Sequence, residues 1–124
     1  MGLSGVTAGL NFTDTFIFKF LDTFCFAPDT LIHVQGKGLI PISEVSLGDI
    51  LTNGSTVTST YRFQADGQPM VYLGDIHVST NHYVKYKDTW IQAKDHPDAK
   101  DGGIWSGQSL ICLDTTTHEI PLGP

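Results

Sequence analysis

Short runs of alternating apolar and polar residues fill the chain from about residue 30 to its end. The runs cover residues 30–34, 38–42, 49–52, 55–63, 69–79, 82–93, 109–115 and 118–122. Turn-forming residues separate them, at Gly36-Lys37-Gly38, Asn53-Gly54, Ala65-Asp66-Gly67, Lys87-Asp88 and 97–107. Period-two runs between such turns are typical of half-buried strands. The pattern therefore predicts an all-β fold, with one helical turn within residues 42–49 that Ser43 caps.

The segment before these runs is rich in phenylalanine. Residues 11–24 hold five of the seven phenylalanines of the chain. Phe12, Phe16, Phe20 and Phe24 recur every four residues, as on one face of a helix, whereas Phe16, Phe18 and Phe20 alternate as in a strand. We therefore expect either a short helix or an extended arm that docks its aromatic face. No tandem repeat is visible along the chain.

Composition limits the classes of partner. The net charge is -6, and the seven basic residues are scattered rather than clustered. Nucleic acids and anionic membrane surfaces both require clustered basic residues, so neither is an expected partner. No apolar run approaches the roughly 20 residues of a membrane span. With only two cysteines and no visible export signal, we expect reduced thiols and a cytoplasmic protein.

One cysteine stands where the aromatic segment meets the strand-like sequence. Cys25 lies within Thr23-Phe24-Cys25-Phe26, and the carbonyl nearest to its thiol is that of Phe24, in its own preceding peptide bond. Attack there forms a thioester, which is an N-to-S acyl shift. The step is uphill, so it needs a proton donor for the leaving nitrogen and donors for the oxyanion. Histidine is the side chain best suited to move that proton near pH 7.

Among the five histidines, His82 has the most suggestive context. It follows a predicted strand over residues 76–79 and a polar turn, with Ser79 three residues before it. A hydroxyl and an imidazole at that spacing can converge on one peptide bond, although a polar turn before a histidine is usually only a turn. Cys112, the second cysteine, lies in a strand run, where a small buried apolar residue is an equally good interpretation.

These features together resemble the Hint family, the self-processing module of inteins and of hedgehog C-terminal domains. The opening Cys25-Phe26-Ala27-Pro28-Asp29-Thr30 matches the family's first motif, and residues 42–51 match its I-x-x-V-x-x-G-D-x-L pattern. Residues 74–82, GDIHVSTNH, match the motif that ends in histidine, and residues 85–97 match a tryptophan-containing strand. The resemblance covers residues 25 to about 120.

The resemblance implies a pseudo-twofold horseshoe of short antiparallel strands. It assigns Cys25 as nucleophile, Phe24-Cys25 as the scissile bond and His82 as proton donor to its nitrogen. Ser79 assists; the family usually has Thr at that position, so the neighbouring Thr80 is an alternative. Cys112 and His118 match a late family block near the active centre, but His118 also fits a surface residue on an edge strand.

The expected organisation is an N-terminal leader over residues 1–24 and a Hint-like domain over residues 25–124. The expected activity is a single-turnover cleavage or acyl transfer, with the protein's own flanking polypeptide as substrate. The chain has no Asn after Asn81, so splicing by asparagine cyclisation is expected only if a complementary fragment supplies a missing C-terminal part. The alternative function is a non-catalytic binding or structural module with an aromatic docking segment.

No cofactor or dedicated metal site is expected. Cys25, His82, Cys112 and His118 could gather in the fold, but the chain has no Cys-x-x-Cys pair and no His pair at helical spacing. Such spacings are the usual sequence signal of a zinc site. The cysteines and histidines are therefore interpreted as groups for acyl transfer rather than as metal ligands.

Overall fold

The computed structural model describes residues 15–20, 25–64, 66–106 and 109–123, and it confirms the all-β prediction. Its strands are β2 (Phe16–Lys19), β3 (Leu31–Val34), β4 (Gly38–Pro41), β5 (Val57–Gln64), β6 (Pro69–Leu73), β7 (Ile76–Ser79), β8 (Tyr83–Tyr86), β9 (Thr89–Gln92), β10 (Lys100–Ile104), β11 (Ser109–Thr115) and β12 (Glu119–Leu122). Two single 3-10 turns accompany them, η1 (Ile42–Glu44) and η2 (Ala93–Asp95).

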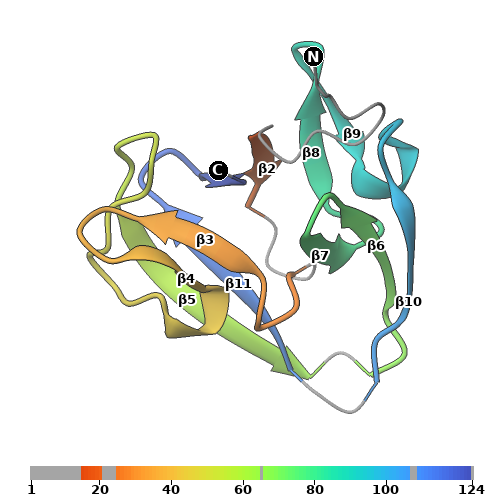
Figure 1. Cartoon of the computed structure of the whole chain (residues 1–124), viewed down its shortest axis with the longest axis horizontal. Helices are drawn as coiled ribbons and strands as arrows, with labels where there is room; N and C mark the ends of the chain where they lie inside the picture. Colours follow the sequence, from red (N-terminus) through yellow and green to blue (C-terminus); the bar gives the residue numbers. More distant parts are fainter. Residues whose placement is uncertain (1–14, 21–24, 65, 107–108, 124) are drawn as a thin grey trace, which may run out of the picture.

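All named strand pairs are antiparallel. The strand orders are β10-β6-β7, β11-β5, β12-β2-β8-β9 and β3-β4. Phe26 joins the first two sets, because it forms an antiparallel bridge to Val78 of β7 and another to Ile111 of β11. In Figure 1, β3, β4, β5 and β11 make one half of the molecule, and β6 to β10 make the other.

The two halves contain the same small unit, a hairpin followed by a 3-10 turn. The units are β3-β4-η1 and β8-β9-η2. Equivalent backbone hydrogen bonds close them: Ile42 to Thr30 and Ala93 to His82 at 2.7 Å each, Ser43 to Pro28 at 3.1 Å, and Lys94 to Thr80 at 3.0 Å. The two units therefore repeat the same backbone geometry, although they have few residue identities in common.

The core has two clusters. The larger contains buried aliphatic side chains from both halves together with Phe16, Phe18 and Phe26. The smaller contains Cys25, Met70, Leu110 and Cys112, against which Phe20, Tyr61, Phe63 and Trp105 pack. Both candidate thiols therefore lie in one apolar cluster.

The described part of the leader is an internal strand. β2 lies between β12 and β8, as Figure 1 shows, with Phe18 opposite both Ile120 and Val84. Phe18 is completely buried, whereas the alternating Lys19 is exposed. The extended-arm prediction is therefore confirmed for residues 16–19. Phe12 and Phe24 lie outside the described residues.

Some local predictions are confirmed and others are wrong. Lys87 and Asp88 have φ of 49° and 64° and connect β8 to β9, as their position predicted. The sequence predicts a turn over residues 97–107, but this stretch contains β10, whose Gly102 and Gly103 weaken the strand signal. Ser43 is not a cap: Pro41 precedes η1, and no side-chain hydrogen bond caps that turn.

None of the helices in the described ranges has the length and apolar character needed to cross a membrane.

Gly102 is required for the close approach of β10 to β6. A Cβ atom on it would lie 2.9 Å from backbone atoms of Met70 and Val71. We expect Gly102→Ala to lower the free energy of unfolding by about 1–3 kcal/mol, because backbone on both sides must move apart. Chemical denaturation measures the change. The matched control is Ile104→Ala on the same strand, which is 64% exposed and should change stability by less than about 0.5 kcal/mol.

Candidate active site

Backbone hydrogen bonds hold Cys25 between the two halves of the molecule. Its neighbour Phe26 exchanges two backbone hydrogen bonds with Ile111, at 2.9 and 2.8 Å. On the other side, Ser79 N–H donates to the Cys25 carbonyl at 3.1 Å, and Ala27 N–H donates to the His77 carbonyl at 3.0 Å. These bonds extend a continuous antiparallel ladder from β7 through residues 25–27 to β11.

The ladder brings three predicted site residues to one face. In antiparallel pairing, residues directly opposite each other point to the same side of the sheet. Cys25 is opposite Ser79 on one side and Cys112 on the other, as the pairing of Phe26 with Val78 and Ile111 requires. Cys25 is 1% exposed, and Ser79 and Cys112 are completely buried. Both cysteines are present as thiols.

His82 is also completely buried and lies against the residue that follows Cys25. Its ring centroid is 4.8 Å from that of Phe26 and 5.6 Å from that of Phe18, which contacts it edge-on. The backbone N–H of His82 donates to the Ser79 carbonyl at 3.1 Å. Ser79 therefore links the histidine turn directly to Cys25.

A single hydrogen bond defines the tautomer of His82. Nε2 lies 2.7 Å from the carbonyl oxygen of Lys19, on the leader strand. Because a carbonyl can only accept, Nε2 carries the proton, and the neutral ring has its lone pair on Nδ1. Nδ1 and the Ser79 hydroxyl are the buried side-chain polar atoms that lack a hydrogen-bond partner within the described part of the chain.

Burial controls the charge of His82. Loss of solvation lowers the pKa of the imidazole from 6.5 to about 4, and the hydrogen bond to the Lys19 carbonyl opposes this only in part. The ring is therefore neutral at neutral pH. Because its pKa is lowered, this imidazole is a weak proton acceptor at Nδ1, and once protonated it releases the proton readily.

The remaining predicted site residues are Thr80, His118 and Phe24. Thr80 lies beyond the end of β7 and is partly exposed, so Ser79 rather than Thr80 lies opposite Cys25. His118 is not brought into the buried group. Its ring is exposed and lies 2.9 Å from Asp114, and its φ of 59° places it in the turn before β12. Phe24, on the other side of the candidate scissile bond, lies outside the described residues.

The sequence did not reveal the Lys19 carbonyl as a site group. A backbone oxygen carries no side-chain signature, and Lys19 itself points its side chain toward solvent and the Trp90 ring.

The described residues contain no group of three or more His, Cys, Asp or Glu side chains arranged to hold a metal ion. The buried group itself offers a thiol, a hydroxyl and an imidazole, from Cys25, Ser79 and His82.

Comparison with known proteins identifies no family. No protein-family model matches the chain. No curated protein matches it significantly.

The neutral state of His82 predicts a pH-dependent stability. In the unfolded chain this residue becomes protonated below about pH 6.5. In the folded chain it becomes protonated only near pH 4. The free energy of unfolding should therefore fall by up to about 3 kcal/mol as the pH drops from about 6.5 to about 4, and no further from this cause. Denaturant titrations at a series of pH values measure it.

The control for this prediction compares slopes rather than absolute stabilities. His82→Gln keeps a polar side chain but removes the titrating group, so this part of the pH dependence should disappear. His118→Gln changes an exposed histidine and should retain it. Equal slopes for wild type and His82→Gln would contradict the assignment.

Proposed function

We propose that this chain is a self-processing domain of the Hint type, the family that its motifs resemble, and that it acts once on its own Phe24–Cys25 bond. The observation that carries the proposal is the buried group around Cys25. Ser79 lies opposite the thiol, His82 packs on Phe26, and both Ser79 Oγ and His82 Nδ1 lack partners among the described residues. Buried polar atoms without partners are costly, so the retention of these two near the Cys25 segment favours a functional role.

The proposed reaction is an N-to-S acyl shift. The Cys25 sulfur forms a bond to the Phe24 carbonyl carbon, and the thiol proton passes to Nδ1 of His82. The resulting imidazolium then gives that proton to the Cys25 nitrogen, the carbon–nitrogen bond breaks, and a thioester and the α-amine of Cys25 remain. A pKa near 4 suits the second step, because the protonated ring is a strong donor.

The attached substrate has a second role in this mechanism. The leader supplies the Lys19 carbonyl that holds the proton on Nε2 and so leaves the Nδ1 lone pair available. It also supplies Phe18, which packs against both His82 and Phe26. Because substrate and catalyst are one chain, high effective concentration replaces a binding cleft.

The architecture supports the same proposal. The chain contains two repeated hairpin-and-turn units, and backbone hydrogen bonds hold Cys25 between the two halves. Both features are compatible with the pseudo-twofold horseshoe expected from the resemblance. The thioester then has three possible fates in the proposal: hydrolysis, transfer to another nucleophile, or splicing with a complementary C-terminal fragment.

The second candidate function is a non-catalytic all-β module. The observation that favours it is the apolar setting of Cys25, whose thiol shares a buried cluster with Met70 and Leu110. Such a setting disfavours the thiolate and is typical of inert structural cysteines. The two candidates differ in one measurable respect, the formation of a cleavable thioester at residue 25.

Nucleophile-induced cleavage tests the proposed function. Hydroxylamine or dithiothreitol should separate residues 1–24, about 2.6 kDa of a chain of 13.5 kDa with 124 residues. Cys25→Ala should abolish the cleavage, and His82→Ala should slow it at least about 100-fold, as expected for loss of proton transfer. Mass spectrometry under denaturing conditions measures both.

The matched control for His82 is His33→Ala, which changes an exposed histidine on β3 and should leave the rate as in wild type. Ser79→Ala should slow cleavage by about tenfold, as expected if the hydroxyl makes one hydrogen bond to the reacting groups during the reaction. An intact mass that persists in wild type at high nucleophile concentration supports the inert module instead.

The position of β2 predicts that cleavage does not by itself release the leader. β2 lies between β12 and β8, and its Phe16 and Phe18 are buried. Burying each phenylalanine contributes about 1.5–3 kcal/mol, so the cut fragment should remain bound as a strand. The two pieces should elute together in size-exclusion chromatography and separate in concentrated guanidinium.

Two variants on β2 make this prediction specific. Phe18→Ala removes the buried anchor, so the fragment that this variant cuts, even if more slowly, should dissociate in native buffer. Lys19→Ala changes an exposed side chain and keeps the backbone carbonyl, so the fragment should stay bound. Immediate dissociation from the wild-type domain would contradict the retained strand.

A further inference from the structure

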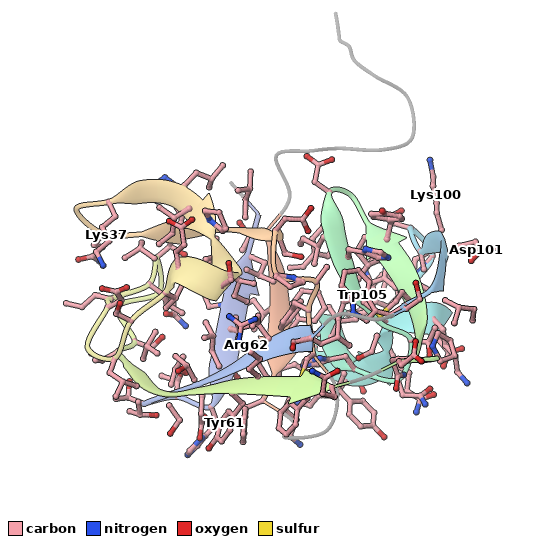
Figure 2. The ribbon with its side chains drawn as sticks, turned by 90° about the horizontal axis from the view of Figure 1, so that it is seen from below. Lys37, Tyr61, Arg62, Lys100, Asp101 and Trp105 are labelled. Carbon is pink, nitrogen blue, oxygen red and sulfur yellow. The ribbon has the colours of Figure 1, made fainter. Side chains whose placement is uncertain are left out.

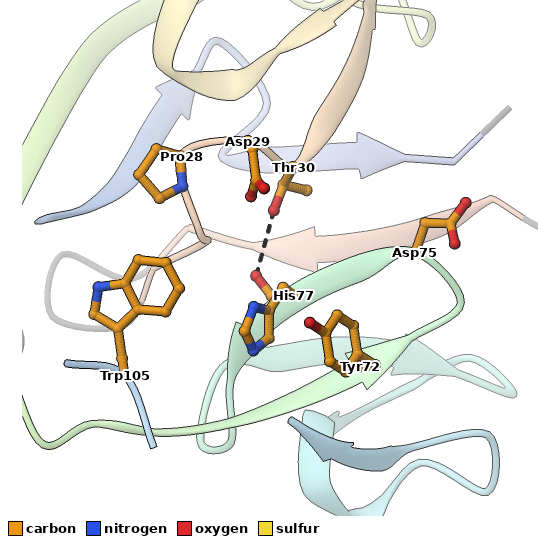
Figure 3. A pocket seen from close by; sticks show the side chains of 7 residues that line it. All are labelled: Pro28, Asp29, Thr30, Tyr72, Asp75, His77 and Trp105. Atoms are coloured by element: carbon orange, nitrogen blue, oxygen red, sulfur yellow. Dashed lines mark hydrogen bonds between the residues drawn. The ribbon is translucent and has the colours of Figure 1, made fainter. Parts of the chain in front are cut away.

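A pocket opens beside the strand that carries Ser79. Its volume is about 440 Å³, and it lies between the loop after Ala27, strands β6 and β7 and the end of β10. Figure 3 shows Asp29 and Asp75 at its rim, with Tyr72, His77 and Trp105 as aromatic surfaces below and beside them. A pocket of this size can hold one large side chain with part of its backbone.

The aromatic surfaces are held in place by their neighbours. The His77 ring stacks on Tyr72, with centroids 4.2 Å apart and planes 11° apart, and meets Trp105 edge-on at 5.6 Å. His77 Nε2 donates to the Gly102 carbonyl at 2.9 Å, which fixes the ring. The pocket is therefore preorganised, and little ordering is needed when a ligand enters.

The two carboxylates in the pocket have no cationic partner within the described residues. The ion pairs found there join Lys37 to Asp49 and His118 to Asp114, and neither includes Asp29 or Asp75. Asp29 and Asp75 line the same pocket as Tyr72 and Trp105. Carboxylates and aromatic rings that line one pocket suit a cation, above all a planar guanidinium. The pocket chemistry therefore selects a positively charged side chain.

The pocket lies on the same face of the ladder as the Cys25 thiol. His77 and Ser79 alternate with the buried Val78 on β7, so their side chains share a face, about 7 Å apart along the strand. Trp105 touches both places, because it packs against the cluster that contains Cys25 and also lines the pocket. Figure 2 shows Trp105 in the middle of the molecule, between the half with Lys37 and Arg62 and the half with Lys100 and Asp101.

We propose that this pocket is the acceptor subsite of the domain and takes a cationic side chain, Arg-like in shape, next to the nucleophile that attacks the thioester. This inference rests on the proposed self-processing function. The acceptor nucleophile forms a bond to the Phe24 carbonyl carbon, the bond from that carbon to the Cys25 sulfur breaks, and the acceptor's proton ends on that sulfur. The cation only positions the acceptor and takes no part in the exchange.

Binding is tested first, in a form that cannot react. The Cys25→Ala protein is titrated with arginine amide and with citrulline amide, its neutral isostere, while the indole N–H signal of Trp105 is followed by NMR. Arginine amide should shift this signal at about fivefold lower concentration than citrulline amide. Trp90, the other tryptophan, serves as internal reference. Equal effects of the two amides would overturn the cation site.

Transfer is tested next, with the dipeptide amides Cys-Arg and Cys-citrulline as acceptors for the wild-type protein. Cys-Arg should react about fivefold faster, and Asp29→Asn or Asp75→Asn should reduce this preference toward one. Asp88→Asn removes an exposed carboxylate on the β8-β9 turn and should retain the preference, which controls for the overall negative charge.

The outcomes separate this inference from the proposed function. If hydroxylamine cleaves the chain but both acceptors react equally, the acceptor subsite is overturned and the self-processing function stands. If no nucleophile cleaves the chain, the self-processing function and the acceptor role fail together. The Trp105 titration then decides alone whether the pocket binds a cation.

Discussion

The backbone pairing of Phe26 with two different strands is the constraint on which the rest of the structure depends. Its bridges to Val78 and Ile111 join β7 to β11 through a segment only a few residues long. Hydrogen bonds of 2.8–3.1 Å on both sides hold Cys25 opposite Ser79 and Cys112. A thiol on a loop would move relative to its partners, whereas this one has its position set by the ladder.

The leader strand belongs to the same arrangement. Phe18 packs against both Phe26 and His82. The Lys19 carbonyl accepts a hydrogen bond from Nε2–H, the one N–H of the neutral imidazole. The same burial that stabilises the core therefore lowers the pKa of His82 and selects its tautomer. Folding and the chemistry proposed for the site depend on one set of contacts, so changes at Phe18 should affect both.

Local elements were predictable where sequence signals are local. The strand Ile76–Ser79 and the turn at Lys87-Asp88 follow from alternation and from turn residues within a few positions. β10 was missed because Gly102 and Gly103 replace the apolar residues that mark a strand. Gly102 has a long-range cause, the close approach of β10 to the backbone of Met70 and Val71, whereas Gly103 has a positive φ of 76°. The repeated hairpin-and-turn unit leaves no tandem repeat in the sequence, because its two copies share backbone hydrogen bonds rather than side chains.

The sequence by itself determined the all-β class and most turns. It also identified Cys25, Ser79 and His82 as candidate site residues, because these inferences depend only on side-chain type and spacing. Tertiary structure alone decided which of these meet. It placed Cys112 beside Cys25, left His118 exposed, and made a backbone carbonyl of the leader the partner of His82. It also gathered Asp29, Asp75 and Trp105 around one pocket. Such contacts join segments far apart along the chain, and backbone groups, identical in every residue, carry no signal of them in the sequence.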